Sequence, residues 1–137
     1  MIRPICRDVL LLSRKSTAAG KEDLQTAIDL ADTLRANSAR CVGMVANMIG
    51  VLKNIIAVQT EKGIVVMINP VIVAHSKESY EASEGCLSLN GERMAKRYKN
   101  ISVEYRDMNM KKQRGMYSDF TAQIIQHEID HLNGILI

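Results

Sequence analysis

The chain has 137 residues, of which 47% are hydrophobic and 24% charged, and its formal net charge is +3. We expect one domain, residues 1–137, because this length can bury a hydrophobic core. No apolar run reaches the roughly 20 residues of a membrane span, and the N-terminus lacks a secretory core, so we expect a cytoplasmic protein with no membrane contact. The basic clusters Arg93–Arg97 and Lys111–Arg114 contain no aromatic residue. We interpret them as solvated surface and not as a specific nucleic-acid site.

The first strong periodic segment runs from about Lys21 to Asn37, where Leu, Ile and Ala recur at helical spacing between charged residues. It predicts an amphipathic helix with one buried stripe. Two β-rich runs follow, Val51–Gln59 and Gly63–Asn69, and the short polar break between them predicts a hairpin. Pro70 ends or bends the second run, and residues 71–74 continue as extended chain.

Apolar and polar residues alternate along Ile101–Arg106, which predicts another strand, and the polar stretch after it predicts a turn. The last predicted element is a helix from about Ser118 to Asn133. Ser118 or Asp119 can cap its start, and Gly134 fits its end. The order of helix, antiparallel-type strands and helix predicts an α+β fold.

The last helix carries the most informative motif, His127-Glu-Ile-Asp-His131. Residues four apart lie on one face of a helix, so both imidazoles can reach one divalent metal. Glu128 would then lie beside a metal-bound water, which completes the minimal set of a metal-activated hydrolase. Phe120 and Ile124 continue the same stripe and would line a pocket. The alternative is a pair of helix histidines that merely pack or cap.

A catalytic site of this type needs a third protein ligand. His75 is the remaining histidine, but it follows a strand in a polar turn, where a lone histidine is more often a surface residue. Cys86 is better placed, in the short segment Glu84-Gly-Cys-Leu-Ser88, and a thiolate binds a divalent metal strongly. The alternative is a buried structural cysteine. Because the chain has three cysteines and a reducing compartment is expected, we predict no disulfide.

Glu84–Ser88, followed by Gln126-His-Glu-Ile-Asp-His131, resembles two signature motifs of the peptide deformylase family. Met67–Pro70 and Arg97–Asp107 are similar to further segments of that family, so the resemblance covers nearly the whole chain. It implies an α+β fold in which antiparallel or mixed sheets pack around the C-terminal metal-binding helix, with an N-terminal helix.

The resemblance also implies a metallohydrolase that removes the formyl group from the N-terminal formyl-methionine of nascent polypeptides, including chains on the ribosome. It implies that Cys86, His127 and His131 bind one metal, usually Fe2+, with Zn2+, Ni2+ or Co2+ as substitutes. Glu128 would move the proton of the metal-bound water, and the backbone N–H of Leu87 would donate to the oxyanion.

Substrate contacts are also implied by the resemblance. They come from the segments around the metal ligands and from the first family motif. The implied residues are Val42, Gly43, Glu84, Gly85, Phe120, Gln123 and Ile124. Gln123 is more polar than a crevice for a methionine side chain leads one to expect.

The first motif of the family, Gly-φ-Gly-φ-Ala-Ala-x-Gln with φ apolar, reads Cys41-Val-Gly-Met-Val-Ala-Asn-Met48 here. The side chain of Met48 has no N–H to donate to the oxyanion. Losing such a donor costs roughly 3–4 kcal/mol, or about 10²–10³ in rate. Asn47 is adjacent, but it points elsewhere unless the backbone shifts. Arg40 replaces an acidic residue that pairs, in many members, with the position of Arg97, so we expect a repulsion there.

Three functions remain open. The first is a peptide deformylase with reduced activity, which the complete hydrolytic set favours. The second is a deformylase-like paralogue that acts on another formyl or acyl amide, which the altered first motif and crevice suggest. The third is a non-catalytic metal-binding protein that recognises an N-terminal methionine or a partner. Glu128 disfavours the third, because no structural need keeps it beside the histidines.

Overall fold

The computed structural model describes residues 1–137. Two helices are longer than two turns, α2 (Leu24–Ala36) and α3 (Asp119–Leu132). They confirm the two predicted helices, except that the first turn of the earlier one is a 3-10 turn, η1 (Lys21–Asp23). A one-turn helix, α1 (Val9–Leu12), and a second 3-10 turn, η2 (Ala46–Ile49), were not predicted. None of the helices is long and apolar enough to span a membrane.

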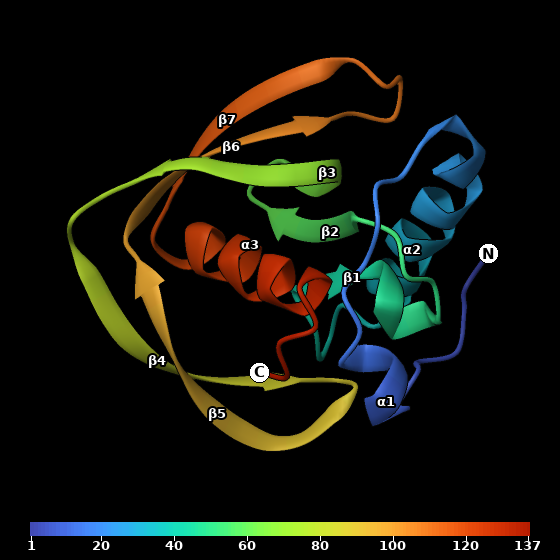
Figure 1. The fold of residues 1–137 in the computed structure, drawn as a ribbon, viewed down its shortest axis with the longest axis horizontal. Helices are drawn as coiled ribbons and strands as arrows, with labels where there is room; N and C mark the ends of the chain where they lie inside the picture. The colour runs from blue at the N-terminus through green and yellow to red at the C-terminus, as the bar shows by residue number, and fades with distance from the viewer.

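The strands form two antiparallel sheets (Figure 1). The smaller sheet is a hairpin of β4 (Ser79–Cys86) and β5 (Leu89–Tyr98). The larger sheet has five strands in the order β1-β2-β3-β6-β7. Their bounds are Gly43–Val45, Ile55–Thr60, Gly63–His75, Asn100–Arg106 and Lys112–Ser118. The α+β fold predicted from the sequence is confirmed.

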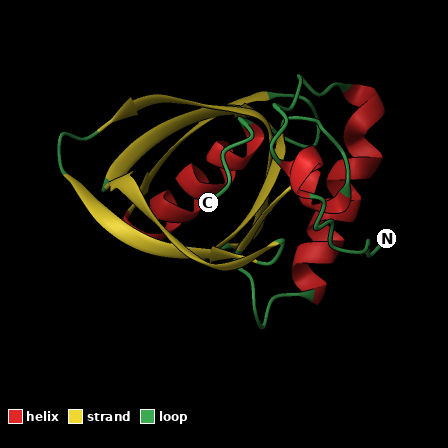
Figure 2. Ribbon diagram, turned by 60° about the horizontal axis from the view of Figure 1, so that its bottom comes forward, coloured by secondary structure: helices red, strands yellow, loops and turns green.

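Helix α3 lies between the five-stranded sheet and the β4–β5 hairpin (Figure 1). In Figure 2 the strands curve around this helix, while the other helices lie together to one side. Strand β2 is in contact with both α2 and α3. Its first four residues, Ile55–Val58, are therefore fully buried and read as a continuous apolar run. The main hydrophobic core lies between the five-stranded sheet and the inner faces of α2 and α3, and it holds α3 in place on the sheet.

The predicted hairpin between the first two β-rich runs is confirmed, because β2 ends at Thr60 and β3 begins at Gly63. The hydroxyl of Thr60 donates to the carbonyl oxygen of Gly63 across the turn, at 2.8 Å. Strand β3 continues through Pro70 to His75, with shifts in its register against β6. Pro70 therefore lies in an irregular part of the strand, where its missing N–H is tolerated.

Strands β1, β5 and β7, and most of β4, were not predicted. β7 is an edge strand with no buried residue, so it lacks the apolar alternation that marks a half-buried strand. β5 contains the basic cluster Arg93–Arg97, and Arg97 is only 3% exposed. The interpretation of that cluster as solvated surface is therefore wrong for Arg97. Ser118 occupies the N-cap of α3, but its side chain makes no capping hydrogen bond.

Candidate metal centre and active site

Helix α3 carries His127, Glu128 and His131. His127 contacts Glu84 of the hairpin, whereas Glu128 lies against Gly43 of β1. All three side chains of α3 are buried, because β1 and β2 pack against one side of the helix and β5 approaches it from the other. The Nε2 atoms of His127 and His131 are 3.0 Å apart, as the spacing of four residues predicts. Both rings thus offer the same nitrogen to one point in space.

Cys86 is the last residue of β4, directly before the hairpin turn. This turn brings its sulfur to the two histidines, and the three ligand atoms all lie within 4.8 Å of one another. A tetrahedral ion with bonds of about 2.0–2.3 Å separates such atoms by roughly 3.3–3.6 Å. The group therefore fits a divalent metal after small side-chain rotations. His75 is exposed on β3 and stacks on Tyr98, away from this group.

The protonation of the two histidines differs. Burial lowers the pKa of His131 to about 3, so its ring is neutral and can bind a metal. Burial also acts to lower the pKa of His127, but hydrogen bonds to Cys86 and Glu84 outweigh it and raise the pKa to about 10. The surroundings of His127 thus favour one positive charge where the sulfur and imidazole ligands converge. This is the electrostatic setting that a metal cation requires.

Glu84 connects the metal centre to a buried charge network. Nδ1 of His127 donates to Oε1 of Glu84 at 2.8 Å. Arg97 donates to both oxygens of Glu84, at 2.6 and 2.9 Å, and to Asp130 at 2.6 Å. Burial alone would raise the pKa of Glu84, but these hydrogen bonds lower it to about 2. The carboxylate therefore stays ionised and fixes the orientation of the His127 ring, as carboxylates behind metal-binding histidines commonly do.

The expected repulsion between Arg40 and Arg97 is absent. Arg97 is neutralised by Glu84 and Asp130, whereas Arg40 is exposed and donates to the side chain of Asn37 at 3.0 Å. The family motif alone could not reveal these partners of Arg97, because Asp130 and Glu84 reach it only when α3 and the hairpin meet in the fold.

Glu128 lies beside the metal centre in a buried position, with 4% of its surface exposed. Its Oε1 atom has no hydrogen-bond partner, and burial raises the pKa of Glu128 to about 7. Gly43 of β1 makes room for it, since a Cβ there would lie 2.6 Å from Oε2 of Glu128 and 2.7 Å from Ile124. A carboxyl group with a pKa near neutrality and an unpartnered oxygen is suited to accept and return a proton.

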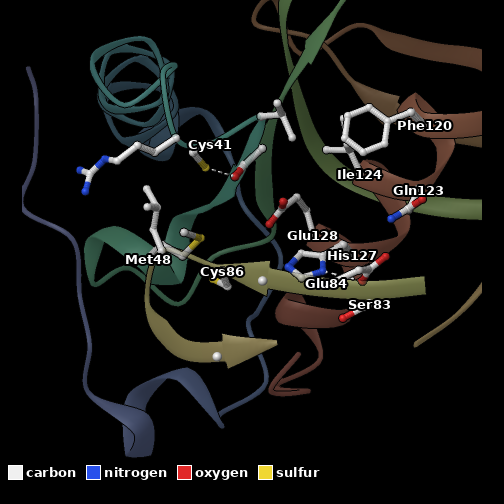
Figure 3. Close-up of a pocket in the computed structure, with 16 residues that line it drawn as sticks. Cys41, Met48, Ser83, Glu84, Cys86, Phe120, Gln123, Ile124, His127 and Glu128 are labelled. Atoms are coloured by element: carbon white, nitrogen blue, oxygen red, sulfur yellow. Dashed lines mark hydrogen bonds and ion pairs between the residues drawn. The ribbon is translucent and has the colours of Figure 1, made fainter. Parts of the chain in front are cut away.

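A cavity of about 470 Å³ opens beside the metal centre (Figure 3). It is lined by every residue for which a catalytic or substrate-binding role was expected, and by the metal ligands Cys86 and His127. These expected residues are Val42, Gly43, Met48, Glu84, Gly85, Leu87, Phe120, Gln123, Ile124 and Glu128. His131 does not line the cavity and lies behind His127, with 1% of its surface exposed.

Met48 occupies the cavity wall where the family motif has glutamine. Asn47 does not replace that amide, because it is fully buried and its Nδ2 donates to the carbonyl oxygen of His131 at 3.1 Å. The side chain of Asn47 thus ties η2 to the end of α3 and is turned away from the cavity.

Sequence reasoning missed four residues that line the cavity: Arg40, Cys41, Ser83 and Gly91. The thiol of Cys41 donates to the carbonyl oxygen of Gly43 at 2.8 Å, and burial raises the pKa of Cys41 to about 12. It is therefore a neutral thiol and no part of the metal group. Its place directly before Val42 and Gly43 was the available signal. For Ser83 and Gly91 the sequence offers no such signal, because only the geometry of the hairpin brings them to the cavity.

The arrangement agrees with comparisons to known proteins. A model of the polypeptide deformylase family matches residues 5–137. The peptide deformylase of Clostridium beijerinckii is 53% identical over 137 residues, which are 100% of both chains. That of Finegoldia magna is 37% identical over 132 residues, covering 92% of this chain and 80% of the relative.

Solved structures agree as well. The peptide deformylase of Thermotoga maritima matches with a TM-score of 0.89 at 28% identity, covering 99% of this chain and 95% of that one. An Acinetobacter baumannii peptide deformylase with Met-Ala-Ser bound matches with a TM-score of 0.88 at 27% identity, covering 99% and 97%. The chain therefore belongs to the peptide deformylase family of metallohydrolases.

Proposed function

We propose that this enzyme removes the N-formyl group from the N-terminal formyl-methionine of nascent polypeptides, including ribosome-associated chains, as a single-domain cytoplasmic protein. The observation that carries the proposal is the meeting of three metal-ligating side chains with Glu128 at one end of a cavity. The cavity wall formed by Val42, Phe120 and Ile124 is apolar and suits a methionine side chain. The related Acinetobacter baumannii enzyme was solved with Met-Ala-Ser, a peptide that begins with methionine.

Cys86, His127 and His131 would hold one divalent ion, and we propose Fe2+, with Zn2+, Ni2+ or Co2+ as substitutes. When bound, such an ion acidifies water and polarises a formyl oxygen. Glu84 keeps the Nε2 atom of His127 directed at this position, because it accepts the proton of Nδ1. The ligand set would join one thiolate to two imidazole nitrogens, with His127 giving up its Nε2 proton as the ion binds, and so matches the preferences of these metals.

The chain supplies the remaining steps from two residues. Glu128 would take a proton from the attacking water and return it to the nitrogen of the leaving amine, which needs a group whose pKa lies near the working pH. The backbone N–H of Leu87, which also lines the cavity, would donate to the oxygen of the formyl group as negative charge develops on it. Oε1 of Glu128 has no hydrogen-bond partner within the chain, so it is free to accept this proton.

Met48 is the reason to propose reduced activity. A glutamine there would add a second donor for the developing oxyanion, and neither Asn47 nor Cys41 supplies one, because each already donates to a backbone carbonyl. We expect the missing donor to lower kcat by about 10²–10³ relative to the same site with glutamine.

Formate release from formyl-Met-Ala-Ser tests the proposal, with protein purified under reducing, anaerobic conditions and its metal content measured. The native chain should release formate slowly, and Met48→Gln should raise kcat. Met116→Gln is the matched control, because Met116 is 84% exposed on β7 and should leave the rate unchanged. A metal-loaded native chain that releases no formate, with no gain in Met48→Gln, would refute the proposed reaction.

A second candidate is a paralogue that hydrolyses another small formyl or acyl amide. Two polar changes in the cavity favour it, the loss of the amide at Met48 and the presence of Gln123. The same assay run with formyl peptides that carry other first residues, and with acetyl-Met-Ala-Ser, separates the two. A higher kcat/KM for any of these than for formyl-Met-Ala-Ser would favour the paralogue.

A further inference from the structure

Gln123 places a polar amide in the apolar part of the cavity. It lies on α3 between Phe120 and Ile124, both of which line the same cavity, and it is half-buried. Figure 3 shows its side chain at the cavity wall, with the amide nitrogen on the side of the other labelled cavity residues. The chemistry proposed above does not use this amide, so its presence in a crevice for a side chain needs its own explanation.

Tyr80 determines which end of this amide is free. Its hydroxyl donates to Oε1 of Gln123 at 3.0 Å, joining β4 to α3. The pKa of Tyr80 is raised, mainly by burial, so the phenol remains a proton donor at neutral pH. The oxygen of Gln123 is thereby occupied, while its Nε2 has no hydrogen-bond partner within the chain. Tyr80 thus leaves an N–H donor of Gln123 available to whatever fills the cavity.

A group that fills the cavity displaces water from this N–H. An apolar group leaves the donor without a partner, whereas an acceptor restores the hydrogen bond. Norleucine has the length of methionine and no acceptor, a thioether is a weak acceptor, and a sulfoxide carries a strongly polar oxygen. The three side chains are close in shape, so they differ mainly in what they offer to the N–H of Gln123.

We infer that Gln123, oriented by Tyr80, is a specificity-determining residue that selects a hydrogen-bond acceptor in the first side chain of the substrate, so that peptides beginning with methionine sulfoxide bind alongside those beginning with methionine. The inference rests on the proposed function for the placement of that side chain in the cavity. One hydrogen bond of this kind changes affinity by roughly 3- to 10-fold. A sulfoxide is also costlier to remove from water than a thioether, so the effect appears in the comparison of variants and not in absolute affinities.

Binding of deformylated peptides tests the inference without depending on turnover. Calorimetry on the metal-loaded enzyme would measure Kd for Met-Ala-Ser and for its norleucine and methionine-sulfoxide analogues. The ratio of Kd for the norleucine peptide to Kd for the sulfoxide peptide should fall roughly 3- to 10-fold in Gln123→Leu. Gln123→Glu should lower it too, because it keeps the shape and the acceptor for Tyr80 but lacks the N–H.

Tyr80→Phe should lower the same ratio by a smaller factor, because the amide can then rotate. Tyr105→Phe is the matched control, since Tyr105 lies on β6 outside the cavity, and it should leave the ratio unchanged. A ratio within twofold of the native value in Gln123→Leu and Gln123→Glu would overturn the inference. An equal change of Kd for all three peptides would also overturn it, because a residue that merely shapes the cavity would give that result. The absence of binding for every peptide would overturn it too. Intact binding without formate release from formyl-Met-Ala-Ser would instead count against the proposed reaction.

Discussion

Replacing Glu84 by glutamine tests whether the buried charge network stabilises the site. The Glu84 and Arg97 side chains are 5% and 4% exposed and share a two-pronged contact at 2.6 and 2.9 Å. Removing one partner of a buried pair costs about 3–5 kcal/mol when the other charge is left without compensation. Asp130 would still contact Arg97 at 2.6 Å, so we expect a loss near the lower end of this range. The pKa of Glu84 leads to a similar magnitude: lowering it from 4.5 to about 2 corresponds to roughly 3 kcal/mol at 1.36 kcal/mol per unit.

Urea unfolding of the metal-free protein at neutral pH would measure this loss for Glu84→Gln. Glu78→Gln is the matched control, because the pair of Glu78 with Lys99 is formed by exposed side chains at 3.2 Å, and such pairs contribute at most about 1 kcal/mol. Since folding lowers the pKa of Glu84, its contribution is complete above pH 4.5 and is lost as pH falls toward 2. The difference between wild type and Glu84→Gln should therefore shrink in acid. A loss under 1 kcal/mol at neutral pH would refute this reasoning.

Three further predictions concern the metal centre. Gly43→Ala should lower kcat by about 10²-fold and leave the circular dichroism spectrum unchanged. The added Cβ would lie 2.6 Å from Oε2 of Glu128, which is too close, so the carboxylate would have to move. An unchanged kcat would show that Glu128 has room to move. Cys86→Ser should reduce the metal bound per chain, measured by elemental analysis after dialysis, and full retention would exclude Cys86 as a ligand. Glu128→Gln should retain metal but lose about 10²–10⁴ in kcat, and near-native formate release would exclude its role in proton transfer.

The parts of the site that follow from local sequence were predictable. The spacing of His127 and His131 fixes their common helix face, whatever the rest of the fold. The core strands β2 and β3 are marked by apolar runs, since burial on a sheet imposes that pattern. Cys86 could be named from the residues as a candidate ligand, but a cysteine beside a hairpin turn has no periodic signature, so the family resemblance was needed to choose it over a buried structural cysteine.

The rest depended on contacts between distant segments. Arg97 looked like one of several surface charges, and its burial becomes favourable only when Glu84 and Asp130 arrive from other elements. Strand β7 buries no residue, so its pairing with β6 leaves no trace in its hydrophobicity. The hydrogen bond between Tyr80 and Gln123 links residues 43 positions apart, and neither residue alone suggests it.

Met48 and Gln123 alter the cavity at different stages of the reaction. A donor for the oxyanion acts on charge that exists only in the transition state, so its loss at Met48 should lower kcat and leave peptide binding largely unchanged. The N–H of Gln123 meets the substrate side chain already in the bound complex, so it should act on affinity in the ground state and the transition state alike. The two side chains come from η2 and α3 and share no hydrogen bond. Selection of the first residue and the rate of the chemical step can therefore vary independently, so a change of kcat caused at position 48 should leave the discrimination among peptides by Gln123 unchanged.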